Sequence, residues 1–273
     1  MLLFYIYLFG NVNYFIVDIG VCRQSVCLVY VLQIKNTYTM TTTPNAFFEI
    51  IDKVSMLRQF QLFSDLTEEE FQDLARATEI KAIAKHKYIF RSGDDSDFLY
   101  VLINGTIKVG NTSSDGREVI KTILHPTALF GESGLSSNEV RNSFAKAIDS
   151  EVRLLKIDVN GFKDLMKSNF AFNLKVVENL GNKIARIENR LESLVFNDAR
   201  TRIVDFIRDN ANKFGRKVGY EMLLKHSLTQ QDIANFTGTS RQTVTSVLND
   251  LRSSNQIYFK RKSILIRDLE NLA

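Results

Sequence analysis

The chain has 273 residues, of which 45% are hydrophobic and 24% are charged, a composition typical of folded globular proteins and not of disordered ones. The formal net charge of +4 is unevenly distributed. Residues 40–199 carry 20 Lys and Arg against 23 Asp and Glu, whereas residues 200–273 carry 13 against 7. A basic end on an acidic body indicates a polyanionic partner for that end, or only a chance excess of charge on a solvated surface.

The first 39 residues differ in composition from the rest. Their only charged side chains are Asp18, Arg23 and Lys35. The apolar run over residues 1–17 is shorter than the ~20 residues of a spanning helix, and it lacks the basic start and cleavage site of a signal peptide. We predict that the working protein starts at Met40 and that residues 1–39 are an apolar extension outside the functional fold. A membrane anchor is the alternative.

Metal and catalytic chemistry have little support in the sequence. The two cysteines, Cys22 and Cys27, lie in the first 39 residues, which excludes a Cys-ligated iron–sulfur or zinc site in the rest of the chain. The three histidines are scattered without metal-ligand spacing. Because no nucleophile, base and orienting group come together in a motif, we predict neither a metal site nor an enzyme.

Residues 40–168 are expected to form a domain with an antiparallel β-roll. Thr67 and Glu70 form a capping box in a helical segment over residues 47–78. From residue 80 to 157 the hydrophobic period is two, and the turn signals Asn104-Gly105 and Asp115-Gly116 favour hairpins. Such a roll has an inner pocket, so it either binds an effector or is a closed structural barrel.

A long helix is predicted over residues 169–197. It carries an apolar seam at alternating intervals of three and four residues, which is typical of a coiled-coil contact. The seam indicates a homodimer, although it could instead pack on the roll. Asp198 is a good N-cap for a further helix, so the next domain is expected over residues 198–273. The seam residues are Val177, Leu180, Ile184, Ile187, Leu191 and Leu194.

The stretch LTQQDIANFTGTSRQTVTSVLNDL, residues 228–251, has the spacing of a helix-turn-helix. Thr229 can cap the first helix, Gly238 supplies the positive φ of the turn, and Thr239 with Gln242 can cap the second helix. A plain helical hairpin is the alternative. The outer face of the second helix is almost uncharged, as major-groove reading requires. We predict DNA contacts at Thr229, Ser240, Arg241, Gln242, Thr245, Ser246 and Asn249, and at the tip of a two-stranded wing, Lys260, Arg261 and Lys262.

The same stretch resembles the DNA-binding helices of the Crp/Fnr transcription-regulator family. LYVLINGTIKV and LFGESGLSSNEVRNSFAKA resemble that family's β-roll and its phosphate-binding cassette. The resemblance covers residues 47–267 and follows the same order of parts. It implies a homodimeric regulator with a cyclic-nucleotide-binding-like roll, a dimerisation helix and a winged helix-turn-helix, and it implies RNA polymerase as a partner.

The resemblance also implies an effector site, at Gly131, Glu132, Ser133, Arg141 and Asn142. In cyclic-AMP-responsive members the Gly-Glu pair meets the ribose and the arginine meets the phosphate. Here the interval from Glu132 to Arg141 is one residue shorter, and the adenine-contacting positions of the dimer helix are Ile187 and Glu188. A cyclic nucleotide or another anionic effector is therefore one interpretation. An internal salt bridge between Glu132 and Arg141 in an empty cassette is the other.

Together these features predict an α+β protein: an N-terminal antiparallel β-roll, a long dimerisation helix and a C-terminal winged helix-turn-helix. The expected function is that of a cytoplasmic DNA-binding regulator, a homodimer that reads a palindromic operator in double-stranded DNA. The alternative is a cyclic-nucleotide-binding regulatory module of a membrane or kinase system. A channel needs more spans than one short run, and a kinase subunit needs no winged helix. No membrane partner is expected.

Overall fold

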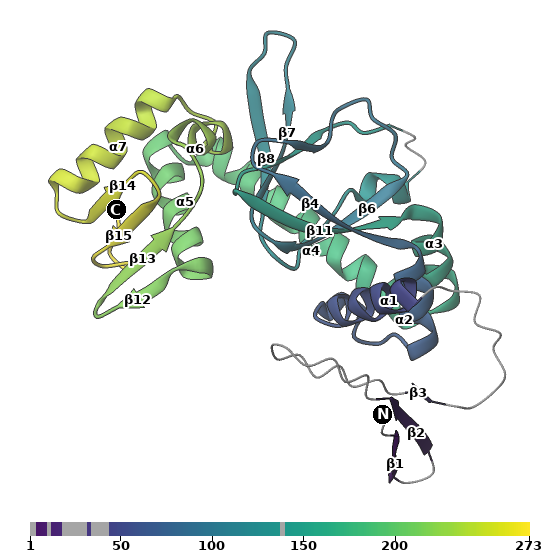
Figure 1. Cartoon of the computed structure of the whole chain (residues 1–273). Coiled ribbons are helices and arrows are strands. Elements are labelled where there is room, and N and C mark those ends of the chain that lie inside the picture. Colours follow the sequence, from purple (N-terminus) through teal and green to yellow (C-terminus); the bar gives the residue numbers. More distant parts are fainter. Residues whose placement is uncertain (1–3, 10–11, 18–31, 34–43, 137–139) are drawn as a thin grey trace. The chain divides into compact units, whose positions relative to one another are not determined.

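A computed structural model describes residues 4–9, 12–17, 32–33, 44–136 and 140–273 (Figure 1). It divides into two units, residues 1–47 and 48–273. The first unit holds a small antiparallel sheet of β1 (Phe4–Phe9), β2 (Val12–Val17) and β3 (Leu32–Gln33). Cys22, Cys27 and Met40 lie outside the described residues, so the prediction of a start at Met40 stays a prediction. None of the described helices is long and apolar enough to cross a membrane.

Two helices precede the roll. Helix α1 (Pro44–Leu57) is followed by a short 3-10 helix, η1 (Gln61–Phe63), and by α2 (Glu68–Arg76). The capping box predicted at the start of α2 is present, with the Thr67 hydroxyl accepting from the Glu70 amide and the Glu70 carboxylate accepting from the Thr67 amide. These helices share an apolar cluster with one sheet of the roll, which holds the roll's outer face away from water.

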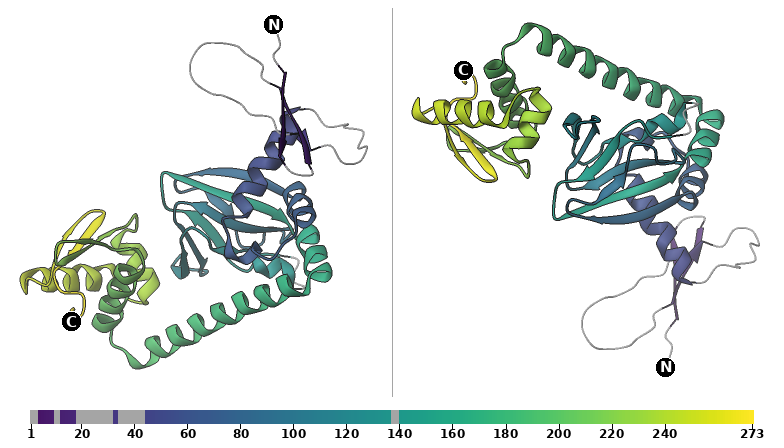
Figure 2. Two further views of the ribbon diagram at one scale, coloured as in Figure 1. Left: turned by 90° about the horizontal axis from the view of Figure 1, so that it is seen from below. Right: turned by 90° about the horizontal axis from the view of Figure 1, so that it is seen from above.

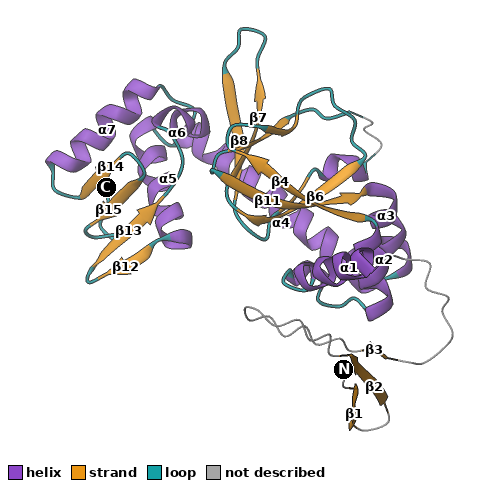
Figure 3. Ribbon diagram, in the orientation of Figure 1, coloured by secondary structure: helices purple, strands orange, loops and turns teal. Residues whose placement is uncertain are grey.

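The β-roll consists of two four-stranded antiparallel sheets (Figure 3). The first has the order β5-β10-β7-β8, and the second has the order β4-β11-β6-β9. The strands are β4 (Thr78–Ala84), β5 (Tyr88–Phe90), β6 (Phe98–Asn104), β7 (Ile107–Thr112), β8 (Glu118–Leu124), β9 (Leu129–Phe130), β10 (Phe144–Ala147) and β11 (Glu151–Asp158).

One of the two predicted hairpins is wrong. Asp115-Gly116 lies between β7 and β8, which pair with each other as expected. Asn104-Gly105, in contrast, joins β6 to β7, and these strands belong to different sheets. Gly105 has a φ of 89°, so the turn geometry that the sequence requires is present. The chain uses it to pass from one sheet to the other, because β6 pairs with β11 and β9 instead.

Helix α3 (Val159–Ser168) leaves the roll and leads into the long helix α4 (Phe170–Phe196), which Figure 2 shows as one continuous rod. The N-terminal turns of α4 pack on α3 through Phe162 and Phe172, whose ring centroids are 5.2 Å apart. Most of the predicted seam is exposed along α4: Ile184 by 57%, Ile187 by 67% and Leu191 by 61%. Leu180 is the exception, since it packs against the apolar cluster beneath the roll.

Asp198 caps α5 (Ala199–Phe214), as predicted, by accepting from the Thr201 amide. The C-terminal part continues with β12 (Arg216–Val218), β13 (Glu221–Lys225), α6 (Gln230–Thr237), α7 (Arg241–Ser253), β14 (Ile257–Lys260) and β15 (Ser263–Ile266). The predicted wing is therefore larger than two strands. β14 and β15 complete a four-stranded sheet of order β12-β13-β15-β14, and its apolar face covers α5, α6 and α7.

Candidate nucleic-acid interface and effector cassette

Helices α6 and α7 form the predicted helix-turn-helix. Thr229 caps α6 in a full capping box with Asp232, the third residue of the helix. Gly238 follows with a φ of 65°, and a Cβ at this position would lie 3.0 Å from Leu194 Cδ2 at the end of α4. The backbone conformation therefore favours glycine here, and a larger residue would also have to displace the end of the Leu194 side chain.

The start of α7 corrects one detail of the sequence interpretation. The N-cap is Ser240, whose hydroxyl accepts from the Thr243 amide, and not Thr239 paired with Gln242. Ser240 leaves the side chain of Gln242 free and exposed. The inner face of α7 is buried as predicted, through Val244, Val247 and Leu248.

The outer face of α7 carries the residues expected to read bases. Arg241, Gln242, Ser246 and Asn249 are exposed. Thr245 is half-buried, and its hydroxyl lies 2.8 Å from Gln230 Oε1 and 2.9 Å from the Arg241 carbonyl oxygen. This face presents one guanidinium among neutral donors and acceptors, the chemistry that base edges of the major groove complement.

The tip of the β14–β15 hairpin carries three exposed cations, Lys260, Arg261 and Lys262. They border a cleft of about 890 Å³ that is lined by Gln230 and Arg241 and also by residues of the β-roll, Lys146 and Glu118 among them. The hairpin tip and the start of the recognition helix therefore border one cleft between the C-terminal part and the β-roll. Lysine side chains in such a position neutralise backbone phosphates without distinguishing sequence.

Two arginines bind the C-terminal end of α6, where helix carbonyls lack partners within the helix. Arg190 of α4 donates to the Phe236 carbonyl through Nη2, at 2.5 Å, and to the carbonyls of Ile120 and Lys121 in β8. Arg202 of α5 donates to the Thr237 carbonyl through Nε, at 2.8 Å. Both guanidinium groups also complement the negative end of the helix dipole. No role is predicted from the sequence for Arg190 or Arg202.

The N-terminal end of α6 is bound to the β-roll by an ion pair. Lys108 Nζ of β7 lies 2.8 Å from Asp232 Oδ1 and 2.8 Å from Glu118 Oε2 of β8. Burial alone would raise the pKa of Asp232 and lower that of Lys108. The hydrogen bonds outweigh burial in both cases, so the pKa of Asp232 is lowered and that of Lys108 is raised. Both groups are therefore charged at neutral pH. The sequence interpretation missed this contact.

The effector cassette brings four of its five predicted residues together. Gly131, with a φ of 83°, precedes the 3-10 helix η2 (Glu132–Leu135). Arg141 is 2% exposed, and its Nη1 donates to the Gly131 carbonyl at 2.7 Å and to the Ser133 hydroxyl at 3.3 Å. Its Nη2 donates to the Phe98 carbonyl. Asn142 is exposed.

The acidic residue of the cassette has a different partner from the one considered for it. Glu132 Oε1 lies 2.9 Å from Lys183 Nζ, which also donates to the Leu129 carbonyl at 2.7 Å. The ion pair ties the cassette to α4 in place of the expected Glu132–Arg141 bridge. Within the described residues, Arg141 Nε is buried without a hydrogen-bond partner.

Aromatic rings fill the roll beside Arg141. Tyr100 stacks on Phe130 with centroids 5.2 Å apart, and the guanidinium of Arg141 lies 4.6 Å from the centroid of Phe90. Burial raises the pKa of the Tyr100 hydroxyl and lowers that of Arg141. On α4, Ile187 and Glu188 are exposed and supply neither hydroxyl that an adenine contact would use. The two positions of α4 that would contact adenine thus carry no hydroxyl.

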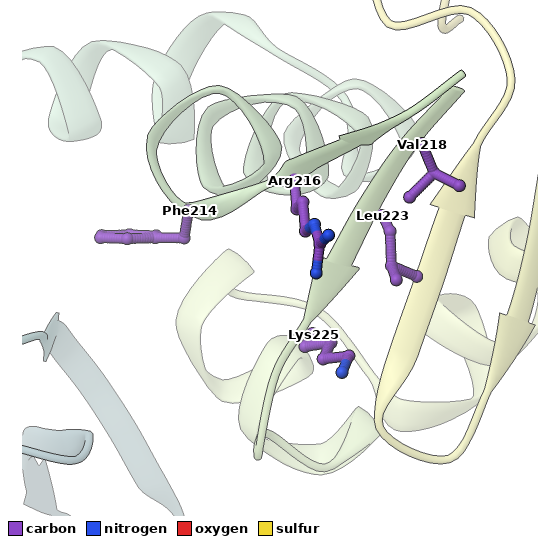
Figure 4. A pocket seen from close by; sticks show the side chains of 5 residues that line it. All are labelled: Phe214, Arg216, Val218, Leu223 and Lys225. Carbon is purple, nitrogen blue, oxygen red and sulfur yellow. The ribbon is translucent and has the colours of Figure 1, made fainter. Parts of the chain in front are cut away.

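A second hollow lies on the sheet of the C-terminal part, away from α7 (Figure 4). Phe214 contributes from the end of α5, Arg216 and Val218 from β12, and Leu223 and Lys225 from β13. Phe214 also stacks on His125 of the roll, with ring centroids 3.7 Å apart. No group of three or more metal-ligating side chains occurs in the part of the chain that the structure describes.

An antiparallel roll, followed by a helix-turn-helix whose outer face presents one guanidinium among neutral donors and acceptors, defines a DNA-binding transcription regulator. Family models agree: residues 80–169 match the cyclic nucleotide-binding domain and residues 201–273 match the Crp-like helix-turn-helix domain. The chain belongs to the Crp/Fnr family of transcription regulators. Because the cyclic nucleotide-binding-type roll and the DNA-binding helices lie on the same chain, a DNA-binding regulator is favoured over a regulatory module of a membrane or kinase system.

Individual relatives support the assignment. The chain is 33% identical over 185 residues to a CRP-like cAMP-activated global transcriptional regulator of Mycobacterium tuberculosis, covering 68% of this chain and 82% of that protein. It is 26% identical to the global nitrogen regulator of Synechocystis sp., covering 69% and 84%. Among solved structures, FixK2 from Bradyrhizobium japonicum shares the fold, with a TM-score of 0.63, 19% identity and coverage of 71% and 96%.

Proposed function

We propose that the protein acts as a homodimer that reads a palindromic operator in double-stranded DNA. The support for a dimer is the apolar seam of α4, which a single chain leaves exposed at Val177, Ile184, Ile187, Leu191 and Leu194. Each of these side chains stabilises an interface by ~1.5–3 kcal/mol when it is fully buried. A two-fold axis through α4 presents two recognition helices, and half-sites about one helical turn apart follow from that symmetry.

The reading residues of this proposal are Arg241 and Gln242 at the start of α7, with Ser246 and Asn249 further along the same face. Thr229, Ser240 and the cations Lys260, Arg261 and Lys262 hold backbone phosphates. The observation that supports reading by these residues is that α7 exposes Arg241 and Gln242 in its first turn, where the N-cap bond is made by Ser240 and not by either of them. An arginine there reaches a guanine edge bidentately, and a glutamine suits adenine.

The domains of this proposal are the roll over residues 40–168, the dimerisation helix over 169–197 and the winged helix-turn-helix over 198–273. Residues 1–39 are an extension outside this working arrangement. The protein acts in the cytoplasm without enzymatic activity or a membrane partner, and RNA polymerase is its partner in transcription, as the family resemblance implies. These points are inferred from family membership and from the sequence.

An effector, where one acts, is anionic and binds at the cassette. Arg141 with Gly131 and Ser133 supplies the anion-binding half, and Asn142 lies at its edge. The Mycobacterium tuberculosis relative is described as cAMP-activated. In this chain the side chains of Ile187 and Glu188 do not complete the usual adenine site, so cyclic AMP in its usual pose is not the expected ligand.

The test of DNA reading is a binding-site selection at one fixed salt concentration, carried out on the wild type and on Arg241→Ala. We expect the wild type to enrich a palindrome. The variant should lose ~1–3 kcal/mol of binding free energy and relax the preference at one position per half-site. Weakening that is equal on all sequences would instead make Arg241 a phosphate contact. A wild type that enriches nothing over random DNA would contradict specific reading altogether.

A further inference from the structure

The side chains of Gln230 and Thr245 connect the two helices of the helix-turn-helix. Gln230 is the first residue of α6, and Thr245 lies in the second turn of α7. The Thr245 hydroxyl lies 2.8 Å from Gln230 Oε1 and 2.9 Å from the carbonyl oxygen of Arg241, one turn earlier in α7. One end of the Gln230 carboxamide is thus held against the recognition helix.

A threonine hydroxyl has one hydrogen, so it donates to only one of these two oxygens at a time. If it donates to Gln230 Oε1, the amide NH₂ of Gln230 points away from Thr245. If it donates to the Arg241 carbonyl, the carboxamide turns over, Nε2 donates to the hydroxyl oxygen, and Oε1 points away. In both arrangements Thr245 uses its hydroxyl inside the protein, and Gln230 keeps one free end.

Gln230 lies beside residues that are proposed above to contact DNA. Gln230 lines the same cleft as Arg241 and the wing lysines Lys260 and Lys262. In a helix-turn-helix the first helix crosses the DNA backbone, while the start of the second helix contacts base edges. A phosphate oxygen only accepts hydrogen bonds, so a phosphate at this place selects the arrangement in which the amide NH₂ points outward.

We propose that Gln230 is a phosphate-contacting residue and that Thr245 is its positioning residue, not a base reader. The two side chains act as one unit: the hydroxyl of Thr245 holds the carboxamide oxygen, and the amide NH₂ donates to the DNA backbone. This fixes the register of α7 in the groove, because the contact is made from α6 but is oriented by α7. The proposal rests on the DNA binding proposed above.

The salt dependence of DNA binding distinguishes a contact by the neutral Gln230 from contacts by the cationic residues of the wing. Gln230 is neutral, so Gln230→Ala should weaken binding about five- to tenfold on all sequences alike without changing the salt slope. Lys260→Ala, which removes a charge, should reduce that slope by about one. Gln230→Glu keeps an oxygen for Thr245 but presents a negative charge to the phosphate. It should weaken binding more than Gln230→Ala does, and most strongly at low salt.

The decisive experiment is a double-mutant cycle on operator affinity, with the full chain and the operator found by selection. We expect Thr245→Val to weaken binding, Thr245→Ser to restore it, and the double variant Gln230→Ala/Thr245→Val to be no weaker than Gln230→Ala within about twofold. The matched control is Asn210→Ala, since the Asn210 amide donates to the Phe206 carbonyl within α5 at 2.7 Å, away from the residues that line the cleft, and should not affect affinity. Thermal unfolding midpoints of all variants verify that each is folded.

Three results would overturn the proposal. Effects of Gln230→Ala and Thr245→Val that add fully would show that the side chains do not act together. A relaxed base preference in Thr245→Val, with Gln230→Ala silent, would make Thr245 the reader. A relaxed preference at one position in Gln230→Ala would make Gln230 a base contact. These outcomes differ from failure of the proposed function, in which the wild type itself enriches no operator.

Discussion

Replacing Lys108 by methionine should destabilise the protein by about 3 kcal/mol. Breaking a buried ion pair from one side costs roughly 3–5 kcal/mol, because the remaining charge stays buried without its partner. Lys108 and Asp232 are each 11% exposed in their side chains, and Nζ lies 2.8 Å from Oδ1. Asp232 keeps the bonds from the Thr229 amide at 2.9 Å and hydroxyl at 2.7 Å, which places the expected loss near the lower limit.

A second replacement tests whether the unpaired charge of Asp232 causes the loss of stability in Lys108→Met. In Lys108→Met/Asp232→Asn the buried charge of Asp232 is gone, and the asparagine oxygen can still accept from the Thr229 amide. Glu118 also loses its partner, but its side chain is 25% exposed and can be hydrated, so most of the lost stability should return. The control is Lys81→Met, which breaks the exposed pair with Glu79, where the two side chains are 48% and 56% exposed. It should change stability by less than about 1 kcal/mol.

The assay is urea unfolding followed by circular dichroism, with the wild type, Lys108→Met, Asp232→Asn, their double variant and Lys81→Met at one pH and salt concentration. The reasoning is refuted if Lys108→Met stays within about 0.5 kcal/mol of the wild type. It is also refuted if the double variant loses the sum of the two single effects, because the pair would then contribute no interaction energy.

Three further predictions follow from other contacts. Ile187→Lys, which puts an ammonium group into the α4 seam, should dissociate the dimer; a sedimentation profile that is still dimeric at micromolar concentration would contradict the seam. Calorimetry should show no tight cyclic-AMP binding, and tight binding abolished by Arg141→Ala would refute the adenine argument while confirming the phosphate role. Burial lowers the pKa of His125, with a smaller opposing effect of Asp149 and a reinforcing one of Lys213. The folded protein therefore binds a proton at His125 less readily than the unfolded chain does. This neutral histidine contributes fully to stability above the ordinary histidine pKa of ~6.5, and the contribution is lost as the pH falls through the lower pKa of His125 in the folded protein. Between pH 7.5 and 5.5 the urea midpoint should fall less in His125→Phe, which keeps the stack on Phe214, and an equal fall would contradict this.

The features that the sequence predicted correctly are local. The caps at Thr67, Asp198 and Thr229 each bond to a backbone amide three residues along the chain, so their residue types and spacing suffice. The positive φ at Gly238 is of the same kind. Even the error at the start of α7 is small, since Ser240 and Thr239 are neighbours with similar capping ability.

The features that the sequence did not predict depend on distant partners. Lys108 and Asp232 are 124 positions apart, and Arg190 and Phe236 are 46 apart. No periodicity distinguishes these cations from ordinary surface charges. Strand β12 was missed because its three residues are all exposed and show no alternation. The turn at Gly105 was interpreted as a hairpin because strand pairing depends on β11, almost fifty residues later.

Helix α6 is fixed at two points that belong to different parts of the molecule. At one end Lys108 binds it to β7, and at the other end Arg190 and Arg202 bind it to α4 and α5. The stack of Phe214 on His125 joins the end of α5 to the roll as well. A rotation of the helix-turn-helix relative to the roll must therefore break at least one of these contacts. In a symmetric pair, the separation of the two recognition helices stays fixed while all of them hold.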